Sequence, residues 1–262
     1  MAVSRHRRHR LVPAAAVVVA VLGVGGCGRA DAREASVERK AFAFSGTALT
    51  VDADGSALEI VPDCIEDVQV TRQIDGWVVL GSGPEASWVT RDGTLTLEVA
   101  CEAVASDCEA RHTVKVPRDV AVTVVDDKGS VTAEGFTAAL KITSDSGSVP
   151  VRDSSGPLRL ACDNGRIVAE RITSRTVTAT SANGSVRLGL TAVPDRVETV
   201  SDNGRIHIEL PASRAPYAVS AESGDADVGN GDVGIAVPTD DDSAPIVTAR
   251  SDNGEVVVRS AN

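Results

Sequence analysis

Basic residues are scarce in this chain of 262 residues. Its 26 lysines and arginines face 37 aspartates and glutamates, and the formal net charge is −11. An acidic surface repels the phosphates of nucleic acids, so we exclude nucleic acid as a partner. Only 4 of the 26 basic residues are lysine. With the abundant Ala, Val and Gly, this usage is typical of a GC-rich, actinobacterial coding sequence.

Catalytic and metal-binding motifs are also missing. The chain contains no G-x-S-x-G elbow, no phosphate-binding glycine loop and no H-E-x-x-H. It has no C-x-x-C pair, and beyond residue 10 its only histidines are His112 and His207, which disfavours a zinc site. We predict that the protein is not an enzyme and has no resident cofactor, apart from the calcium possibility considered below.

What the chain does contain is a repeated tetrad. Ser-Asp-Asn-Gly occurs at 201–204 and 251–254, with close variants at 144–147, 162–165 and 181–184. From Gly129 to Gly204 the corresponding glycines are 18, 18, 19 and 20 residues apart, a period typical of repeat architectures. Asn and Gly tolerate positive φ and reverse the chain with little strain. The predicted turn residues are Asn164, Gly165, Asn183, Gly184, Asn203, Gly204, Asn253 and Gly254.

Apolar and polar residues alternate on both sides of each glycine. Valine, isoleucine, leucine or alanine predominates seven and five residues before the glycine and two and four residues after it. This alternation is typical of a half-buried strand, so the unit is strand, Asx-Gly turn, strand, and the fold is all-β. The position three before the glycine joins the same inward face and carries Asp126, Ser144, Cys162, Ser181, Ser201 and Ser251.

Two architectures fit this unit. In an antiparallel hairpin meander, the strands on either side of each turn would pair. In a parallel β-solenoid, each unit of about 18–20 residues would form one coil, stacked in register on the next. The near-constant period and the small, uniform interior residues favour the solenoid.

The N-terminal residues 1–27 have the features of an export signal. Four arginines within the first ten residues precede an apolar stretch, Leu11 to Gly26, of 16 residues, which is short for a membrane-spanning helix. The stretch ends in Val24-Gly25-Gly26-Cys27, which resembles a bacterial lipobox. The resemblance implies cleavage before Cys27 and lipidation of its thiol; the alternative is an uncleaved N-terminal anchor. Either reading places the rest of the chain outside the cytoplasm.

Four segments follow from the composition, and 48–262 is expected to form one elongated domain. Residues 1–27 are the signal, 28–47 a flexible tether, 48–119 irregular strands that cap the array, and 120–262 the regular array. Trp77 and Trp88 are expected to cap the open core, with an exposed recognition patch as the alternative. Between Gly204 and Gly254 the array is disturbed: we expect a local insertion at 222–229, a turn at Asn230-Gly231 and an exposed acidic loop at 239–243.

The cysteines beyond Cys27 allow three pairings. Cys101 and Cys108 enclose six residues between two strands, so a local disulfide between them is the first choice in an oxidising compartment. Cys162 stands where sister units carry serine and is either a small buried residue or a partner of Cys64.

An aspartate recurs two places before the turn glycine, which raises the question of calcium. The residues are Asp127, Asp145, Asp163, Asp202 and Asp252. In stacked coils these like charges would repel one another, and bridging Ca²⁺ would relieve the repulsion. In the alternative interpretation, each aspartate only braces its own turn.

The tandem S-D-N-G-[SRE]-[VI] units, preceded by Arg111-His112-Thr113-Val114-Lys115-Val116-Pro117, resemble the DUF4097 family of β-strand repeat proteins, which carries an adhesin label inferred from fold. The resemblance covers roughly Leu49 to Arg259. It implies a right-handed parallel β-solenoid, frequent lipoprotein signals, no established activity and no catalytic residues.

We therefore expect a protein on the outer face of the cytoplasmic membrane, anchored by its N-terminal lipid, that binds, adheres or scaffolds through an unidentified envelope or surface ligand. Two alternatives stay open. One is a carbohydrate-active enzyme that uses surface carboxylates of the solenoid. The other is an accessory protein of envelope signalling.

Overall fold

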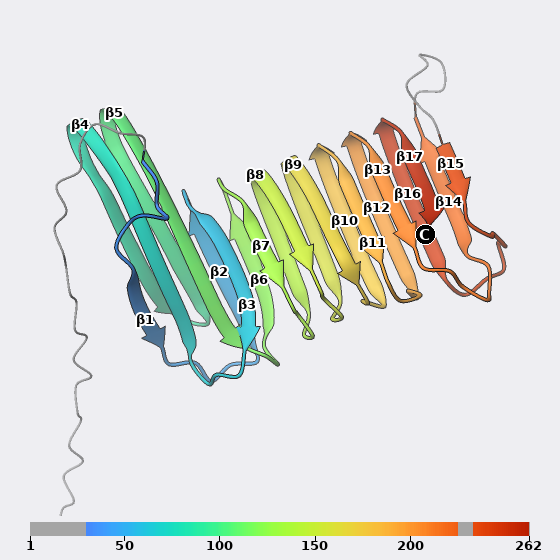
Figure 1. The fold of residues 1–262 in the computed structure, drawn as a ribbon, viewed down its shortest axis with the longest axis horizontal. Helices are drawn as coiled ribbons and strands as arrows, with labels where there is room; N and C mark the ends of the chain where they lie inside the picture. Colours follow the sequence, from blue (N-terminus) through green and yellow to red (C-terminus); the bar gives the residue numbers. More distant parts are fainter. Residues whose placement is uncertain (1–29, 225–232, 262) are drawn as a thin grey trace, which may run out of the picture.

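The computed structural model describes residues 30–224 and 233–261, and these residues form strands and connecting loops without a helix. The 17 strands belong to one continuous hydrogen-bonded system, drawn in Figure 1. They are β1 (Glu38–Phe42), β2 (Ala48–Asp54), β3 (Ala57–Asp63), β4 (Val68–Arg91), β5 (Thr94–Pro117), β6 (Ala121–Asp126), β7 (Val131–Glu134), β8 (Leu140–Arg152), β9 (Leu158–Ile172), β10 (Thr176–Asn183), β11 (Val186–Leu190), β12 (Arg196–Asn203), β13 (Ile206–Leu210), β14 (Ala218–Ser223), β15 (Val233–Ala236), β16 (Ile246–Asn253) and β17 (Val256–Ser260). Nothing in the described part of the chain is a helix able to span a membrane.

The array is a parallel β-solenoid. The strand before each tetrad pairs in parallel with its counterpart in the neighbouring coil, as in β10–β12 and β12–β16, and the strands after the tetrads form a second parallel stack, as in β11–β13 and β13–β17. Like positions are aligned: Ser181 lies opposite Ser201, which lies opposite Ser251. The predicted solenoid is therefore confirmed, and the hairpin meander is wrong for the array.

The core is a column of small apolar side chains between the two stacks. Every inward position around the tetrad glycines is buried, from Val122 and Val124 in β6 to Val256 and Val258 in β17, whereas Val233 and Ile235 of the terminal strand β15 are exposed. Phe136 and Tyr217 are the largest fully buried side chains. Since each coil buries its apolar row only against its neighbours, stability is distributed along the array.

The coils do not stack in the order of the sequence at either end of the array. Coil β2–β3 lies between β5 and coil β6–β7. Coil β16–β17 lies between coil β12–β13 and coil β14–β15, so β14 and β15 form the outer end of the array (Figure 1). At each end, therefore, a coil is inserted between two others and does not follow the order of the sequence.

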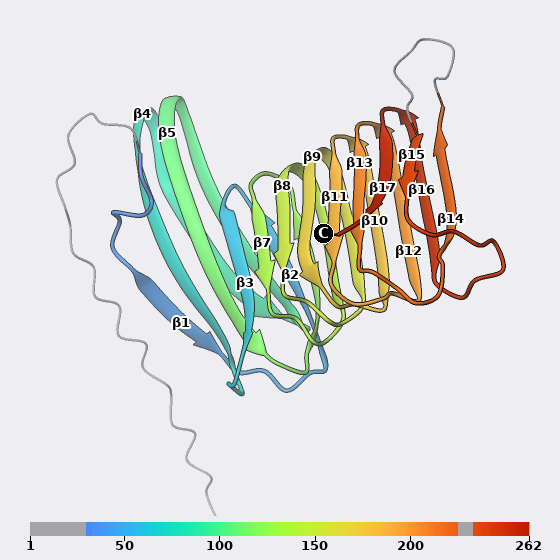
Figure 2. The same ribbon diagram turned by 45° about the vertical axis from the view of Figure 1, so that its right-hand side comes forward.

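At the other end, β4 and β5 form a long antiparallel hairpin of two 24-residue strands. The first five residues of β5 pair with β2 and its last seven with β3, so β5 replaces one coil. The residues between, with their partners in β4, rise beyond the other coils as a bent two-stranded ribbon (Figures 1 and 2). We call this ribbon, residues 74–85 and 100–110, the arch.

The segment predicted as a flexible tether, 28–47, is partly structured. Within it, β1 pairs antiparallel with Val68–Arg72 of β4. A polar composition suggested a linker, but the open edge of β4 offers unpaired backbone groups that a short extended segment satisfies.

The two tryptophans have different surroundings. Trp88 packs against the end of the core, and the Arg72 guanidinium lies 4.0 Å from its ring centroid; this is the capping role expected from the sequence. Trp77 lies on the arch and is 39% exposed.

The disturbance between Gly204 and Gly254 is a single coil with an enlarged corner. Ser223 of β14 aligns with Ser251, and Val233 of β15 aligns with Val256. The extra residues therefore lie between Ser223 and Val233. The predicted turn at Asn230-Gly231 and most of the predicted insertion lie outside the described residues. The acidic side chains of Asp240, Asp241 and Asp242 are exposed.

Candidate functional site

The tetrad glycines allow neighbouring coils to approach closely. A Cβ atom on Gly184 would lie 1.6 Å from the carbonyl oxygen of Gly165, and one on Gly204 would lie 1.9 Å from that of Gly184. Gly129, Gly147 and Gly254 have positive φ, but Gly165, Gly184 and Gly204 do not. The predicted reason for glycine, tolerance of positive φ, is therefore wrong at these three positions. At these positions the neighbouring coil is too close to leave room for a side chain.

The tetrad asparagines form a ladder along one corner of the solenoid. Asn183 Nδ2 donates to Asn164 Oδ1 at 3.1 Å, Asn203 Nδ2 donates to Asn183 Oδ1 at 3.1 Å, and Asn253 Nδ2 donates to Asn203 Oδ1 at 3.0 Å. None of the four has positive φ. Their expected role as left-handed turn residues is therefore wrong, because each side chain instead links its coil to the next.

The inward serines connect coils as well. Ser201 Oγ donates to the Gly184 carbonyl at 3.1 Å, and Ser251 Oγ donates to the Gly204 carbonyl at 2.8 Å. In the same row Asp126 is a buried carboxyl whose Oδ1 has no hydrogen-bond partner in the structure. Burial raises the pKa of Asp126 to about 6, opposed by the hydrogen bond from Ser144 and reinforced by neighbouring aspartates.

The five aspartates of the calcium hypothesis lie on the exposed outer edge of the corners. Ala182 occupies the aligned position between Asp163 and Asp202 and interrupts the row. Among the hydrogen bonds of the described residues, none of the five accepts a backbone N–H of its turn, and Asp252 accepts only a side-chain bond, from Arg250 Nε at 3.1 Å. The turn-bracing interpretation is therefore wrong. In residues 30–224 and 233–261 no three His, Cys, Asp or Glu side chains form a group able to hold a metal ion.

The cysteines of the described region separate into one pair and two free thiols. Cys101 and Cys108 form a disulfide between the two legs of the arch in β5. Cys162 is buried and donates to the Gly147 carbonyl, and burial raises the pKa of its thiol. Cys64 is exposed and does not pair with Cys162. The predicted lipidation site, Cys27, lies outside the described residues.

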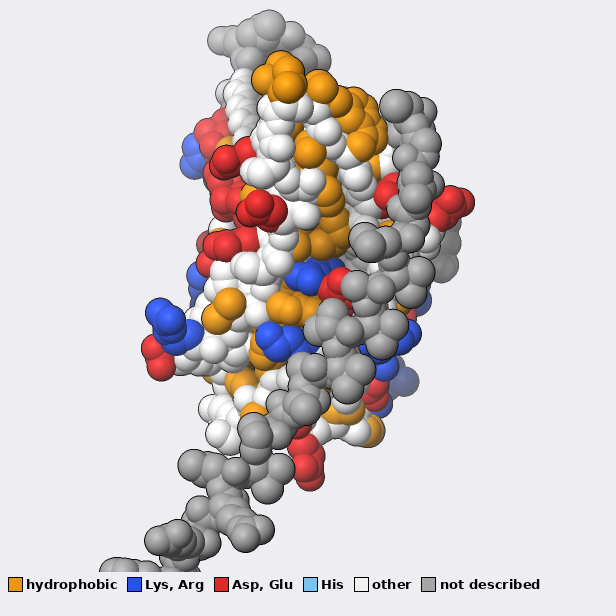
Figure 3. Space-filling view, turned by 90° about the vertical axis from the view of Figure 1, so that its left-hand side faces the viewer, with side chains coloured by type: hydrophobic (Ala, Val, Ile, Leu, Met, Phe, Trp, Pro, Cys, Tyr) orange, Lys and Arg blue, Asp and Glu red, His pale blue; other side chains and the backbone are white. Residues whose placement is uncertain are grey.

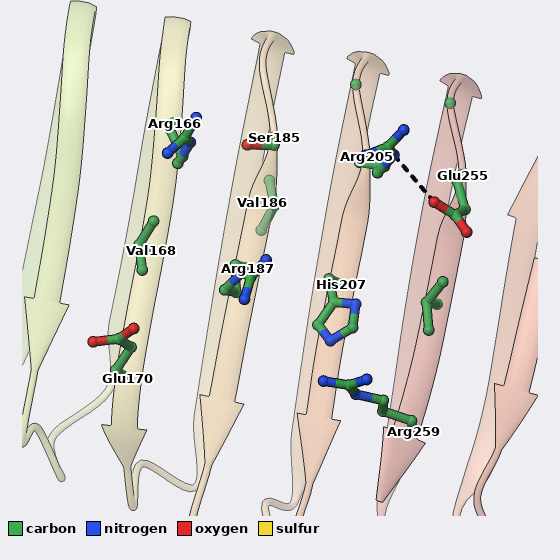
Figure 4. Close-up of a pocket in the computed structure, with 13 residues that line it drawn as sticks. Arg166, Val168, Glu170, Ser185, Val186, Arg187, Arg205, His207, Glu255 and Arg259 are labelled. Atoms are coloured by element: carbon green, nitrogen blue, oxygen red, sulfur yellow. Dashed lines mark ion pairs between the residues drawn. The ribbon is translucent and has the colours of Figure 1, made fainter. Parts of the chain in front are cut away.

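A groove lies on the outer face of the stack formed by β9, β11, β13 and β17 (Figure 4). Its volume is about 1050 Å³. The lining comes from outward positions one, three and five residues after the tetrad glycines, where parallel register brings side chains of four coils together: Arg166, Glu170, Arg187, Arg205, His207, Glu255 and Arg259. We call this surface the arginine groove.

Two arginines of the groove are free and two are neutralised. Arg205 Nε lies 3.1 Å from Glu255 Oε2 (Figure 4), and Arg259 pairs with Glu209. Arg259, assisted by His207 at 3.2 Å, holds the pKa of Glu209 below its usual range. Within the described residues, Arg166 and Arg187 are exposed and no carboxylate pairs with them. The groove therefore presents two uncompensated guanidinium groups on an acidic protein.

These residues occupy outward polar positions that no sequence motif distinguishes. The structure places Glu209 and Arg259 beside His207. The arginines and glutamates of the groove are outward residues of the alternating pattern. Their grouping becomes visible only when β9, β11, β13 and β17 are set side by side in register.

The fold and its corner ladders define a parallel β-solenoid assembled from short repeats. The sequence profile of the family described as Toastrack DUF4097 matches residues 90–260. The chain belongs to this family. No protein with a curated description matches it.

Solved structures share the fold at low sequence identity. One from Parabacteroides distasonis, described as a "putative lipid binding protein", is 14% identical with a TM-score of 0.51 and covers 86% of this chain and 98% of its own. A second from the same species, described as a "putative adhesin", is 10% identical with a TM-score of 0.47 and covers 86% of this chain and 98% of its own. A third, from Bacteroides fragilis and described as "a putative adhesin", is 15% identical with a TM-score of 0.41 and covers 86% and 97%. These likenesses concern the fold alone.

Proposed function

We propose that the protein is a lipid-anchored binding protein on the outer face of the cytoplasmic membrane, and that the arginine groove binds an anionic polymer of the cell envelope. The observation that carries the proposal is the pair of unpaired guanidiniums, Arg166 and Arg187, within a concave surface that spans four coils. Guanidinium forms two parallel hydrogen bonds to phosphate or carboxylate oxygens.

The repeat favours an extended ligand. Neighbouring coils are separated by about 4.8 Å. Arg166 and Arg187 come from successive coils, and Arg187 lies two residues further along its strand, aligned with Val168, so the two guanidiniums lie on a diagonal across the stack. A chain of regularly spaced anions can contact several coils at once. Binding distributed in this way gains affinity from several weak contacts.

The carboxylates of the groove support binding rather than hydrolysis. Each is already paired: Glu170 with Arg152, Glu209 with Arg259 and Glu255 with Arg205. A glycosidase acid needs a raised pKa, whereas the pKa of Glu209 is lowered by its partners. A binding role also agrees with the descriptions of the solved structures named above, none of which names an enzyme.

The lipid anchor rests on the lipobox-like sequence that ends at Cys27. Metabolic labelling with an alkyne fatty acid tests it directly. The wild-type chain should carry the label and float with membranes, whereas Cys27→Ser should carry none. Labelling that survives the substitution would contradict the assignment.

Binding is tested with the chain from residue 28 onward, retained on immobilised phosphodiester-linked or carboxylated envelope polymers. The double variant Arg166→Ala/Arg187→Ala should lose at least tenfold in affinity, and wild-type affinity should fall as salt rises. The control variant Arg118→Ala/Arg214→Ala removes two exposed arginines outside the groove. It therefore has the same net charge as the groove variant. Equal loss in both double variants would show non-specific attraction and refute the groove.

A further inference from the structure

The apex of the arch is apolar and exposed. Leu80 and Val104 lie opposite each other in the β4–β5 ribbon, and each is 82% exposed. Val79 beside them is 49% exposed. Side chains of this size are normally buried, and a group of them at a projecting tip marks a contact surface. Figure 3, which faces this end of the molecule, shows hydrophobic side chains gathered at its upper edge.

The composition of the arch favours apolar contact over charge attraction. The residues flanking the apex pair, 79–81 and 103–105, carry no charge, and the arch as a whole contains acidic residues but no lysine or arginine. Its disulfide, Cys101–Cys108, joins the two legs of β5 below the apex. The apex is therefore held out from the solenoid on a cross-linked support.

The N-terminal segment is fixed against the same arch. The Ala30 amide donates to Asp107 Oδ2 at 3.0 Å, and the Asp31 amide donates to Asp75 Oδ2 at 2.8 Å. Ala30 and Ala32 are buried, and Gln73 Nε2 donates to the carbonyls of Arg33 and Ala35. Residues 30–35 thus follow one leg of the arch, with Ala30 nearest the apex.

Ala30, the first described residue after the predicted anchor at Cys27, therefore lies toward the apex of the arch. Cys27 is three residues before Ala30, and three residues span at most about 10 Å. Asp107, the partner of Ala30, is three residues from Val104, and three residues of a strand again span about 10 Å. A lipid on Cys27 therefore holds the apex within reach of the membrane surface.

We propose that the apex of the arch, Leu80 with Val79 and Val104, inserts into the interfacial region of the lipid bilayer to which the protein is anchored. The inference rests on the lipid anchor of the proposed function and adds a second, protein-borne contact. The arginine groove lies on the strand face, away from this tip, and stays open to ligand.

The test uses the full, processed chain reconstituted into phosphatidylcholine vesicles whose acyl chains carry bromine, a quencher of tryptophan fluorescence. Leu80→Trp places a reporter at the apex, and Val193→Trp places one at another exposed valine, in the loop between β11 and β12. Both variants retain Trp77 and Trp88, so the difference between them reports the added side chain. Matching unfolding temperatures verify that neither substitution disturbs the fold.

We expect Leu80→Trp to lose at least twofold more emission to brominated lipid than Val193→Trp. If both variants float with the vesicles but brominated lipid quenches their fluorescence equally, the inference is overturned and the lipid anchor stands. Failure to float overturns the anchor, and the inference with it. A change at Leu80→Trp that depends on protein density and not on bromine would assign the apex to a second copy of the chain, which also overturns membrane insertion.

Discussion

The backbone of Gly184 lies so close to the carbonyl oxygen of Gly165 in the neighbouring coil that a Cβ atom on Gly184 would be only 1.6 Å from that oxygen. We expect Gly184→Ala to force the two corners apart and to lower the free energy of unfolding by about 3 kcal/mol or more. Gly189→Ala is the control, since its nearest atom would be 3.7 Å away. Urea denaturation measures both, and equal effects would refute the close-approach explanation.

The asparagine ladder gives a second prediction. Asn183→Ala removes one donated and one accepted hydrogen bond, so it should cost about 1–2 kcal/mol of unfolding free energy. Asn183→Asp should cost more at neutral pH, because its carboxylate would face Asn164 Oδ1 without a proton to donate. Asp202→Ala, at an exposed aspartate of the same corner, should change stability by less than about 0.5 kcal/mol. If the ladder does not stabilise the fold, all three variants should have the same unfolding temperature, which would contradict the prediction.

Buried Asp126 makes the folded state less stable as pH rises. Its pKa is raised from 3.8 to about 6, so between these values the folded chain retains a proton that the unfolded chain has lost. Stability therefore falls across this window, by up to about 3 kcal/mol, and the loss persists above it. Asp126→Ser, which copies the neighbouring coils, should raise the unfolding temperature at pH 8 and leave it nearly unchanged at pH 4. An unchanged value at pH 8 would contradict the prediction.

Buried His112 acts in the opposite direction. Its Nδ1 lies 2.9 Å from Ser56 Oγ, and burial, with a smaller contribution from Arg72, lowers its pKa from 6.5 to about 4. The unfolded chain gains a proton first as pH falls through this window, so stability is lost from pH 6.5 toward 4, by about 3 kcal/mol.

The two effects oppose each other over nearly the same range. The Asp126→Ser chain should therefore show a clear rise in unfolding free energy from pH 4 to 6.5, whereas the wild type should show a flatter profile. Denaturation at four pH values measures both profiles, and NMR titration of the His112 ring verifies the group responsible. An equally flat profile in the variant would exclude His112.

The local part of the fold could be predicted from the sequence. Alternation around Gly165, Gly184 and Gly204 predicted the buried rows, because the inward positions of a strand are set by its own residues. The role of the asparagines was missed, since a bond from Asn253 to Asn203 joins residues 50 apart. No local pattern encodes which coil will be the neighbour.

The arch and the arginine groove show the same limit. Irregular strands were expected over 48–119, but the 24-residue span of β5 depends on its pairing with β4. The groove likewise requires the three coils that carry Arg166, Arg187 and Arg205 to be placed side by side. Outward positions face no packing constraint, so their arrangement becomes visible only after the stack is built.

The insertion of coil β16–β17 between coil β12–β13 and coil β14–β15 has a consequence for biogenesis. While the chain emerges from the ribosome or the export channel, β14 and β15 lack their parallel partners until β16 and β17 arrive. The exposed strand edge of β12–β13 also waits for them. A product that stops before residue 246 would therefore leave the edges of β12 and β13 without their partners in β16 and β17, and open strand edges tend to pair with other chains.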